Sequence, residues 1–495
     1  MTNPRFAHEP VSAPGGGLVG LFYFLWLGEH GRGKPRNISE IVAEHPDAGR
    51  HPDADWWGGI GFYHHWGEPF YGYYCSDDEW VVRRHMKLIL QAGIDFLFFD
   101  TTNALIYEKN AKLVMRVLDE YAKDGWDIPK VMFYTNTRSG ETVGKLYDTI
   151  YRPGYCPDTW FLWDGRPVVI ADPEDCSPEC RDFFTIKLSQ WPNEPDKAGG
   201  WPWMDFVRPQ RVFPNLAGEP ECINVSVAQH PQLRFGDSVL YGETGNCGRA
   251  YHDGANDPAP DAWTKGYNFI EQFERALEVK APVTLVTGWN EWIAGRWPGS
   301  PERPIMFVDC ANTEYSRDIE MMRGGYFDNY YRLLCRYVSR RKGADPEVVL
   351  APGGRAVFPG YPDGNFHRDA EGYGTRYVDR SGRYAVRKIT AENRRDEIRF
   401  TLTADRDFDP ADTGGTFMKL YLWDGEGEVP ASVMTREVGA GEVAVSVPRS
   451  AIRGNWLEFK AADSREEIRA PEDFYDHGDV LPLGWARYGI GLADG

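Results

Sequence analysis

The chain has 495 residues, of which 42% are hydrophobic, enough for two or three domains with a sizeable core. Its formal net charge of −19 argues against a nucleic-acid partner, because phosphate binding needs clustered Lys and Arg. The longest apolar run near the amino terminus, LVGLFYFLWLG, is far shorter than the roughly 20 residues needed to span a bilayer, so no membrane partner is expected.

The opening stretch, MTNPRFAHEPVSAPGGG, lacks the basic and apolar regions of a signal peptide. Eight cysteines are scattered through the chain, and Cys176 and Cys180 are the closest pair. No second pair at zinc-like spacing accompanies them, so we predict no metal site and no cofactor. These features predict a cytoplasmic protein with reduced thiols.

Strands and helices alternate over the first part of the chain. Residues 18–26 form a continuous apolar run typical of a buried strand, and a helical pattern follows over residues 76–93. IDFLFFDTTN is a second buried strand that contains Asp100. A helix with its apolar face at Leu113, Val114 and Val117 leads to the strand KVMFYTNT. The short connections imply parallel pairing.

The alternation continues with a helix near residues 141–150 and the stretch TWFLWDGRPVVIADP, which predicts a hairpin feeding another strand. CINVSVAQHP and PVTLVTGWNEW are further strands, and a helix closes the region at residues 326–340. Seven or eight strands over about 340 residues predict an α/β fold, a (β/α)₈ TIM barrel. A doubly wound open sheet is the alternative, but no glycine-rich dinucleotide motif follows an early strand.

The composition and the apolar pattern of the sequence change near residue 345. Residues 345–365 are rich in Pro and Gly and predict a linker after a barrel domain at residues 1–344. Segments such as EIRFTLTAD and GEVAVSVP then alternate apolar and polar residues, with turn signals between them. Residues 366–495 are therefore predicted to form an antiparallel β-sandwich, possibly of a carbohydrate-binding type.

Aromatic residues make up 14% of the chain, and many lie in loops rich in Gly and Pro. Such rings either cover the core or serve as flat platforms for sugar rings. Barrel enzymes carry their working residues at the carboxyl ends of strands, where this sequence places Asp100 and Glu291. Glu68 and Glu243 lie on glycine-bearing loops. Glycosidic cleavage commonly uses two carboxylates, so these four are the predicted catalytic candidates.

The predicted sugar-binding residues combine ring platforms with amides, imidazoles and a guanidinium that can read hydroxyl groups. They are Trp26, His65, Trp66, Asn103, Gln229, His230, Trp289, Asn290, Trp292 and Arg296.

Several segments in order resemble glycoside hydrolase family 99 and its bacterial family-99-like relatives. They are VGLFYFLWLG, WDGRPVVI, VTGWNEW and EYSRDIEMMRGGYFDNYYRLL, and the resemblance covers roughly residues 15–342. It implies a (β/α)₈ barrel acting on α-linked sugars. In this family two glutamates lie in a Glu-Trp-x-Glu-Gly pattern. The first deprotonates the sugar 2-hydroxyl, giving a 1,2-anhydro intermediate, and the second is the acid/base. Glu291 matches the first, and Ala294 stands at the second.

We therefore expect a glycoside hydrolase acting on a small glycan, with Glu291 as base or 2-hydroxyl activator and a second carboxylate, Asp100 first, as acid. Because alanine cannot transfer a proton, Ala294 motivates a rival hypothesis, a catalytically silent carbohydrate-binding protein on a degenerate barrel. A polysaccharide lyase or a glycan-biosynthesis factor is the third alternative. For a lyase, Arg296 and His230 are the candidates that would face a uronate.

Overall fold

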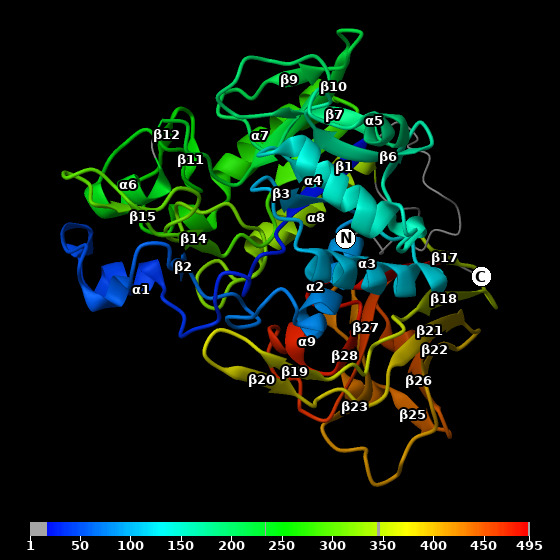
Figure 1. The fold of residues 1–495 in the computed structure, drawn as a ribbon. Helices are drawn as coiled ribbons and strands as arrows, with labels where there is room; N and C mark the ends of the chain where they lie inside the picture. The colour runs from blue at the N-terminus through cyan, green and yellow to red at the C-terminus, as the bar shows by residue number, and fades with distance from the viewer. Residues whose placement is uncertain (1–16, 233, 344–346, 494–495) are drawn as a thin grey trace.

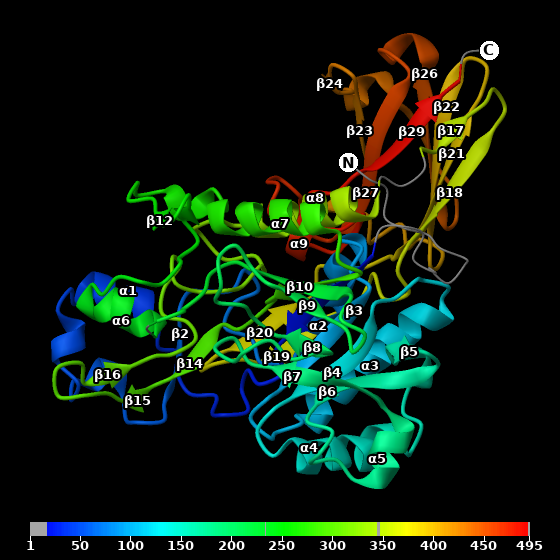
Figure 2. The same ribbon diagram turned by 90° about the horizontal axis from the view of Figure 1, so that it is seen from above.

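A computed structural model describes residues 17–232, 234–343 and 347–493 of the chain (Figure 1). Residues 1–16, on which the expected lack of a leader depends, lie outside the described residues. The first part of the chain forms a barrel-like α/β unit, and the second part forms antiparallel sheets beside it (Figure 2). No helix among the described residues is both long and apolar enough to cross a bilayer. The predicted cytoplasmic setting stays a prediction.

The α/β unit is built on one twisted, mostly parallel sheet. Each parallel strand pairs with its neighbours in the order β8-β7-β6-β4-β3-β1-β13-β10, so the first strand lies beside the last. These strands are β1 (Leu18–Tyr23), β3 (Phe96–Thr101), β4 (Lys130–Thr135), β6 (Arg166–Ala171), β7 (Thr185–Gln190), β8 (Gly200–Pro202), β10 (Pro220–Ser226) and β13 (Val283–Thr287).

The sheet is nearly closed. Among the described residues no hydrogen-bonded ladder joins β8 to β10, and β9 (Val212–Pro214) instead pairs antiparallel with β10. β5 (Leu162–Trp163) adds the predicted hairpin to β6. The predicted α/β barrel is thus confirmed in its coarser form, a nearly closed sheet that is mainly parallel.

Helices cover most of the crossovers, as the alternating pattern predicted. They are α1 (Ile38–Glu44), α2 (Glu79–Gln91), α3 (Glu108–Lys123), α4 (Ser139–Leu146), α5 (Pro178–Phe183), α6 (Phe235–Tyr241), α7 (Tyr267–Val279) and α8 (Asn329–Lys342). The described crossovers from β7 to β8 and from β8 to β10 contain no α-helix. β8 is hydrogen-bonded to β7, so the missing ladder lies at the second of these crossovers, between β8 and β10.

Long loops after the strands pair with one another in short ladders. β2 (Tyr63–His65) pairs antiparallel with β14 (Ile293–Gly295), so a loop that follows β1 lies against a loop that follows β13. β11 (Tyr251–His252) pairs with β12 (Ala255–Asn256), and β15 (Trp297–Pro298) pairs with β16 (Ile305–Met306). These ladders fix the loops that carry the polar residues described below.

The second part of the chain contains two larger sheets. One is β17 (Val349–Leu350), β29 (Tyr488–Leu492), β27 (Trp456–Ser464), β23 (Thr416–Asp424) and β24 (Gly427–Glu428), with β28 (Asp479–Leu481) beside β27. The other is β18 (Arg355–Pro359), β21 (Val386–Asn393), β22 (Glu397–Ala404), β26 (Glu442–Pro448) and β25 (Thr435–Val438). Except for β17 with β29, neighbouring strands are antiparallel.

Rings join the two sheets. Phe459 of β27 lies 5.0 Å from Phe358 of β18 and 4.9 Å from Phe400 of β22, measured between ring centroids. The stretch predicted as a linker contributes β17 to one sheet and β18 to the other, while residues 345 and 346 lie outside the described residues. Alternating apolar residues thus form strands on both sides of this core, as the pattern predicted.

A separate hairpin, β19 (Arg368–Glu371) with β20 (Arg376–Asp379), leaves these sheets and contacts the α/β unit. In Figure 2 this yellow hairpin lies apart from the orange and red sheets. Ion pairs join the two parts nearby. Asp363 contacts Arg83 and Lys87 of α2 at 2.9 Å each, and a short helix, α9 (Asp473–Asp476), adds Tyr475 to the interface.

Candidate active site

The carboxyl ends of the parallel strands share one face of the sheet, and the polar residues of the candidate site follow them there. All five residues of β13, VTLVT, are buried, and Glu291 comes four residues after the strand. Asp100 is the penultimate residue of β3, and His230 follows β10 by four residues. Buried strands therefore fix the starting points of the loops that carry these side chains.

Glu291 is held by Arg317. Nε and Nη2 of Arg317 donate to Oε2 of Glu291 at 3.1 and 2.5 Å. The main-chain N–H of Glu291 donates to Asp318. Glu291 is 4% exposed, and within the described part of the chain no donor reaches its Oε1. Oε1 is thus the oxygen that can accept a hydrogen bond from a ligand.

A second carboxylate contacts the same guanidinium. Oδ1 of Asp309 lies 3.2 Å from Nη2 of Arg317, and Nδ1 of His230 lies 3.2 Å from Nη1. Nη2 contacts both carboxylates, at 2.5 and 3.2 Å, so the two contacting oxygens lie at most about 6 Å apart. The side chain of Asp309 is 37% exposed, so it connects the buried pair with solvent.

Burial raises the pKa of the two buried carboxyl groups, Glu291 and Asp100. It raises the pKa of Glu291 well above its usual range, while Arg317 opposes the rise and Asp309 adds to it. Burial also raises the pKa of Asp100, against a hydrogen bond from the N–H of Thr102. Raised carboxyl pKa values favour proton holding, which a general acid requires.

Aromatic rings line the site beside these carboxylates. The rings of His30 and Tyr63 are stacked 4.4 Å apart, and Trp26 meets each of them edge-on at 5.7 Å. The hydroxyl of Tyr107 lies 3.3 Å from Nε2 of His30. Burial raises the pKa of Tyr63, and the charge of Asp309 adds to the rise. Of the four rings, only Trp26 was predicted.

Three of the predicted platforms lie in the core. Trp66, Trp289 and Trp292 are 0% exposed. Trp66 and Trp292 stack on each other at 4.4 Å, and Trp289 packs edge-on against His85. A ring with no exposed face cannot stack on a sugar, so the platform role predicted for these indoles is corrected to a core role. Periodicity is weak in a loop, which is why the sequence could not show which indoles point inward.

The predicted hydroxyl readers Asn290, Gln229 and Arg296 are also buried, and each has a partner within the protein. Asn290 bonds both main-chain polar groups of Phe24, which ties the ends of β1 and β13 together. Gln229 donates to Gln272 at 2.8 Å, and Arg296 donates to main-chain carbonyls of residues 52 and 58. These side chains shape the loops; the contacts that we expected with a sugar are made with protein.

The remaining predicted residues are spread over the molecule. Glu68 pairs with Arg323 at 3.1 Å, and Glu243 pairs with Arg303 at 2.5 Å, both half-exposed and without a contact to Glu291 among the described residues. Asn103 is exposed in the turn after β3.

His65 and His230 are the two predicted imidazoles. His65 is buried against the rings of Tyr73 and Tyr373, so it has no face for a sugar. His230 reaches the Arg317 cluster. Burial and then Arg317 lower the pKa of His230 to about 3, so this imidazole is neutral at physiological pH.

Ala294 lies in β14, opposite His64 of β2, and is 2% exposed. A carboxylate at this position would replace a small buried side chain inside a ladder. The second carboxylate of the site therefore comes from another element.

Sequence reasoning did not single out Arg317, which contacts the carboxylate of Glu291, or Asp309, which contacts Arg317. Both follow β13 in an irregular stretch, where neither a strand end nor a helical face marks them. For Arg317, the available sequence signal is its position next to the opposite charge of Asp318 in SRD, within the segment EYSRDIEMMRGGYFDNYYRLL that resembles family 99.

Groups able to share a metal ion lie elsewhere. Within the described residues, Asp473, Asp476 and His477 are the one such cluster, and they belong to the second part of the chain. Cys176 and Cys180 are buried free thiols on and beside α5. Neither group contacts Glu291.

Neither a family model nor a curated protein matches the chain. Among solved structures, it is similar to the GH99 endo-alpha-mannosidase from Bacteroides thetaiotaomicron, with 14% identity, a TM-score of 0.38, and 66% of this chain and 98% of that chain covered. A complex of that enzyme with bis-tris-propane gives a TM-score of 0.37. A glycoside hydrolase-like protein gives 12% identity, a TM-score of 0.36 and coverage of 67% and 98%. The resemblance stated from the sequence is thus found again among solved structures.

Proposed function

We propose that the chain is a glycoside hydrolase on a (β/α)₈ barrel that cleaves O-glycosidic bonds of a small glycan or oligosaccharide. The observation that carries the proposal is the buried Glu291, held through one oxygen by Arg317 beside the exposed Asp309. A polar pair with an unbonded carboxylate oxygen, set at the carboxyl ends of barrel strands and faced by stacked rings, suits a sugar substrate.

In the proposed reaction Glu291 takes the proton of the sugar 2-hydroxyl, as the resemblance implies. The 2-oxygen then forms a bond to the anomeric carbon while the bond to the leaving oxygen breaks. Asp100 gives its proton to that leaving oxygen, because its raised pKa lets it hold the proton until the transition state. Water then opens the anhydro ring with the proton transfers reversed, which releases the sugar and restores both carboxyl groups.

A polysaccharide lyase is less well supported by the charges of the site. A lyase must neutralise a uronate carboxylate, and Arg317 is already shared by Glu291 and Asp309. Arg296 donates to main-chain carbonyls, and His230 is neutral. We therefore propose a substrate whose reacting sugar is uncharged.

The test is release of reducing ends from a panel of α- and β-linked oligosaccharides by the wild type and Glu291→Gln. We expect a loss in kcat of about 10²–10⁴ in the variant, the usual size of one proton-transfer contribution. Glu68→Gln is the matched control, since Glu68 is paired with Arg323 outside the site, and it should retain activity.

Absence of cleavage by the wild type, together with glycan binding that Glu291→Gln leaves unchanged, would contradict the proposal. That result would instead favour the silent carbohydrate-binding protein.

A further inference from the structure

The β19–β20 hairpin reaches from the second part of the chain to the loops of the candidate site. Its turn residue Tyr373 accepts a hydrogen bond from the N–H of Gly28 at 2.8 Å, and its own N–H donates to the carbonyl of Tyr73 at 2.9 Å. The N–H of Gly374 donates to the carbonyl of Arg32. Tyr373 is 6% exposed, so the ring is packed as well as hydrogen-bonded.

The first contact leads to the aromatic wall. Gly28 lies two residues after Trp26 and two before His30, and both of these rings meet Tyr63. The hydroxyl of Tyr373 therefore fixes the main chain between two rings of the wall.

The second contact leads to Glu291. The ring of Tyr373 packs edge-on against His65 of β2 at 4.7 Å. His65 pairs with Ile293 of β14, two residues after Glu291. The hairpin is thus joined to the Glu291 loop through one ring contact and one ladder.

The attachment is tight. A Cβ on Gly372 would meet the carbonyl oxygen of Tyr73 at 2.5 Å, and a Cβ on Gly374, which has φ +65°, would meet the Cα of Lys34 at 2.9 Å. At its base, Arg368 forms a buried ion pair at 2.7 Å with Asp78, the residue that caps α2. Close approach of main chain to main chain leaves little freedom for the hairpin to shift.

From these contacts we propose that the β19–β20 hairpin is a positioning element of the candidate site and that Tyr373 is the positioning residue through which it acts. The inference rests on the proposed function. It makes the second part of the chain a component of the catalytic unit: the hydroxyl of Tyr373 positions the substrate-binding wall, and its ring positions the Glu291 loop.

Two variants separate these roles in the full chain, by kcat and KM on a glycan that the wild type cleaves. Tyr373→Phe loses the bond to Gly28 and keeps the ring, so KM should rise about threefold with kcat retained. Tyr373→Ala also removes the ring from His65, and kcat should fall about tenfold, since small displacements of catalytic groups are costly. Recovery of kcat in the Phe variant identifies the ring as the group that positions Glu291.

Tyr475→Phe is the matched control. Tyr475 is another buried tyrosine that joins the two parts, and its hydroxyl donates to Asp328 at 2.8 Å without touching Gly28 or His65. It should leave both kcat and KM within about twofold of wild type. If Tyr373→Ala has the same kcat and KM as Tyr475→Phe, the inference is overturned.

Amide hydrogen exchange gives a readout that needs no activity. We expect faster exchange at residues 26–30 and 63–65 in Tyr373→Ala and not in Tyr475→Phe. Unchanged exchange there refutes the coupling, whatever the activity. If no glycan is cleaved by the wild type while exchange does change, the coupling is supported and only the proposed function fails.

Discussion

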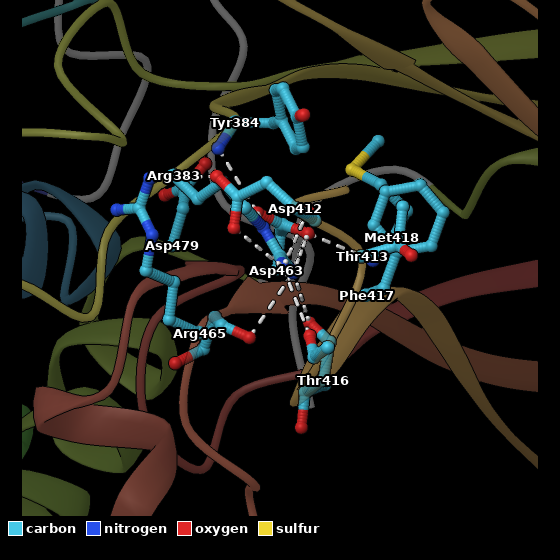
Figure 3. Close-up of polar contacts among 12 residues, drawn as sticks. Arg383, Tyr384, Asp412, Thr413, Thr416, Phe417, Met418, Asp463, Arg465 and Asp479 are labelled. Atoms are coloured by element: carbon cyan, nitrogen blue, oxygen red, sulfur yellow. Dashed lines mark hydrogen bonds and ion pairs between the residues drawn. The ribbon is translucent and has the colours of Figure 1, made fainter. Parts of the chain in front are cut away.

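Each part of the molecule contains a buried arginine–carboxylate pair, and the two pairs are satisfied in opposite ways. In the second part, Arg383 and Asp463 are both buried between the sheets (Figure 3). Arg383 donates to Asp463 and to four main-chain carbonyls, those of Asp412, Gly414, Thr416 and Ser464. The carboxylate of Asp463 accepts in addition from the N–H groups of Tyr384 and Met418.

The guanidinium of Arg317, in contrast, makes its polar contacts within the described part of the chain to side chains, namely two carboxylates and one imidazole, and it packs on the rings of Trp203 and Phe235. One oxygen of Glu291 has no donor among the described residues, and one carboxylate reaches solvent. The carboxylate of Asp412 also lies 3.6 Å from Arg383, but the hydrogen bonds of the Arg383–Asp463 pair end mainly on the main chain. A pair bonded in this way holds loops together, whereas a pair that shares its arginine mainly among titratable groups can respond to a ligand or a proton. The difference predicts separate consequences for stability and for activity.

The largest expected effect is on stability, from Asp463→Asn. The substitution removes the buried carboxylate at 2.8 Å and leaves Arg383 with the more distant carboxylate of Asp412 at 3.6 Å, and breaking such a buried pair costs about 3–5 kcal/mol. We expect the first unfolding transition in calorimetry to fall, while kcat per folded molecule is retained. Glu291→Gln should instead lower kcat and leave the unfolding transition in place, because Arg317 keeps Asp309 as a partner. Equal losses of stability in both variants would show that the two arginine–carboxylate pairs do not differ in role.

The next effect is on the rate, and it identifies the second carboxylate. If Asp100 protonates the leaving oxygen, Asp100→Asn should slow cleavage of a natural glycan about 10²-fold. An aryl glycoside with an acidic phenol leaving group needs no such proton, so the loss should largely disappear on that substrate. Asp309→Asn is the comparison, because Asp309 shares Arg317 with Glu291. If the aryl glycoside restores the activity of Asp309→Asn and not that of Asp100→Asn, the acid is Asp309.

The sequence predicted the parallel sheet well because buried β-branched and apolar runs such as VTLVT have few alternatives. It placed Asp100 and Glu291 near strand ends for the same reason. The loops were predicted less well. Trp66, Trp289 and Trp292 are in the core, since the side-chain direction in a loop depends on contacts such as the stacking of Trp66 on Trp292 that are distant in sequence.

The same limit explains the residues that were missed. Arg317 meets Glu291 from 26 positions away along the chain, and no local pattern marks that contact. The expected linker contains β17 and β18 because Pro and Gly flank these short strands, and pairing with β29 and β21 outweighs the local turn signals. Tertiary contacts decide where propensity is weak.

The smallest expected effect is on the pH profile, and it tests whether the Arg317 cluster is electrically coupled. The pKa of Glu291 is raised by burial and further by Asp309, so its ionised, proton-accepting form is lost as pH falls through that raised pKa. Activity should therefore decline on the acid side at a pH above the usual range of a glutamate.

Asp309→Asn removes a negative charge and leaves Arg317 to Glu291 alone. Both changes favour the ionised form of Glu291, so the acid limb of kcat/KM should move to lower pH and the variant should be severalfold more resistant to acid, relative to its own maximum. Glu68→Gln, outside the cluster, should leave the limb in place. A limb that stays fixed in Asp309→Asn would show that Glu291 does not set it, and the base would then have to be sought in another carboxyl group of the site.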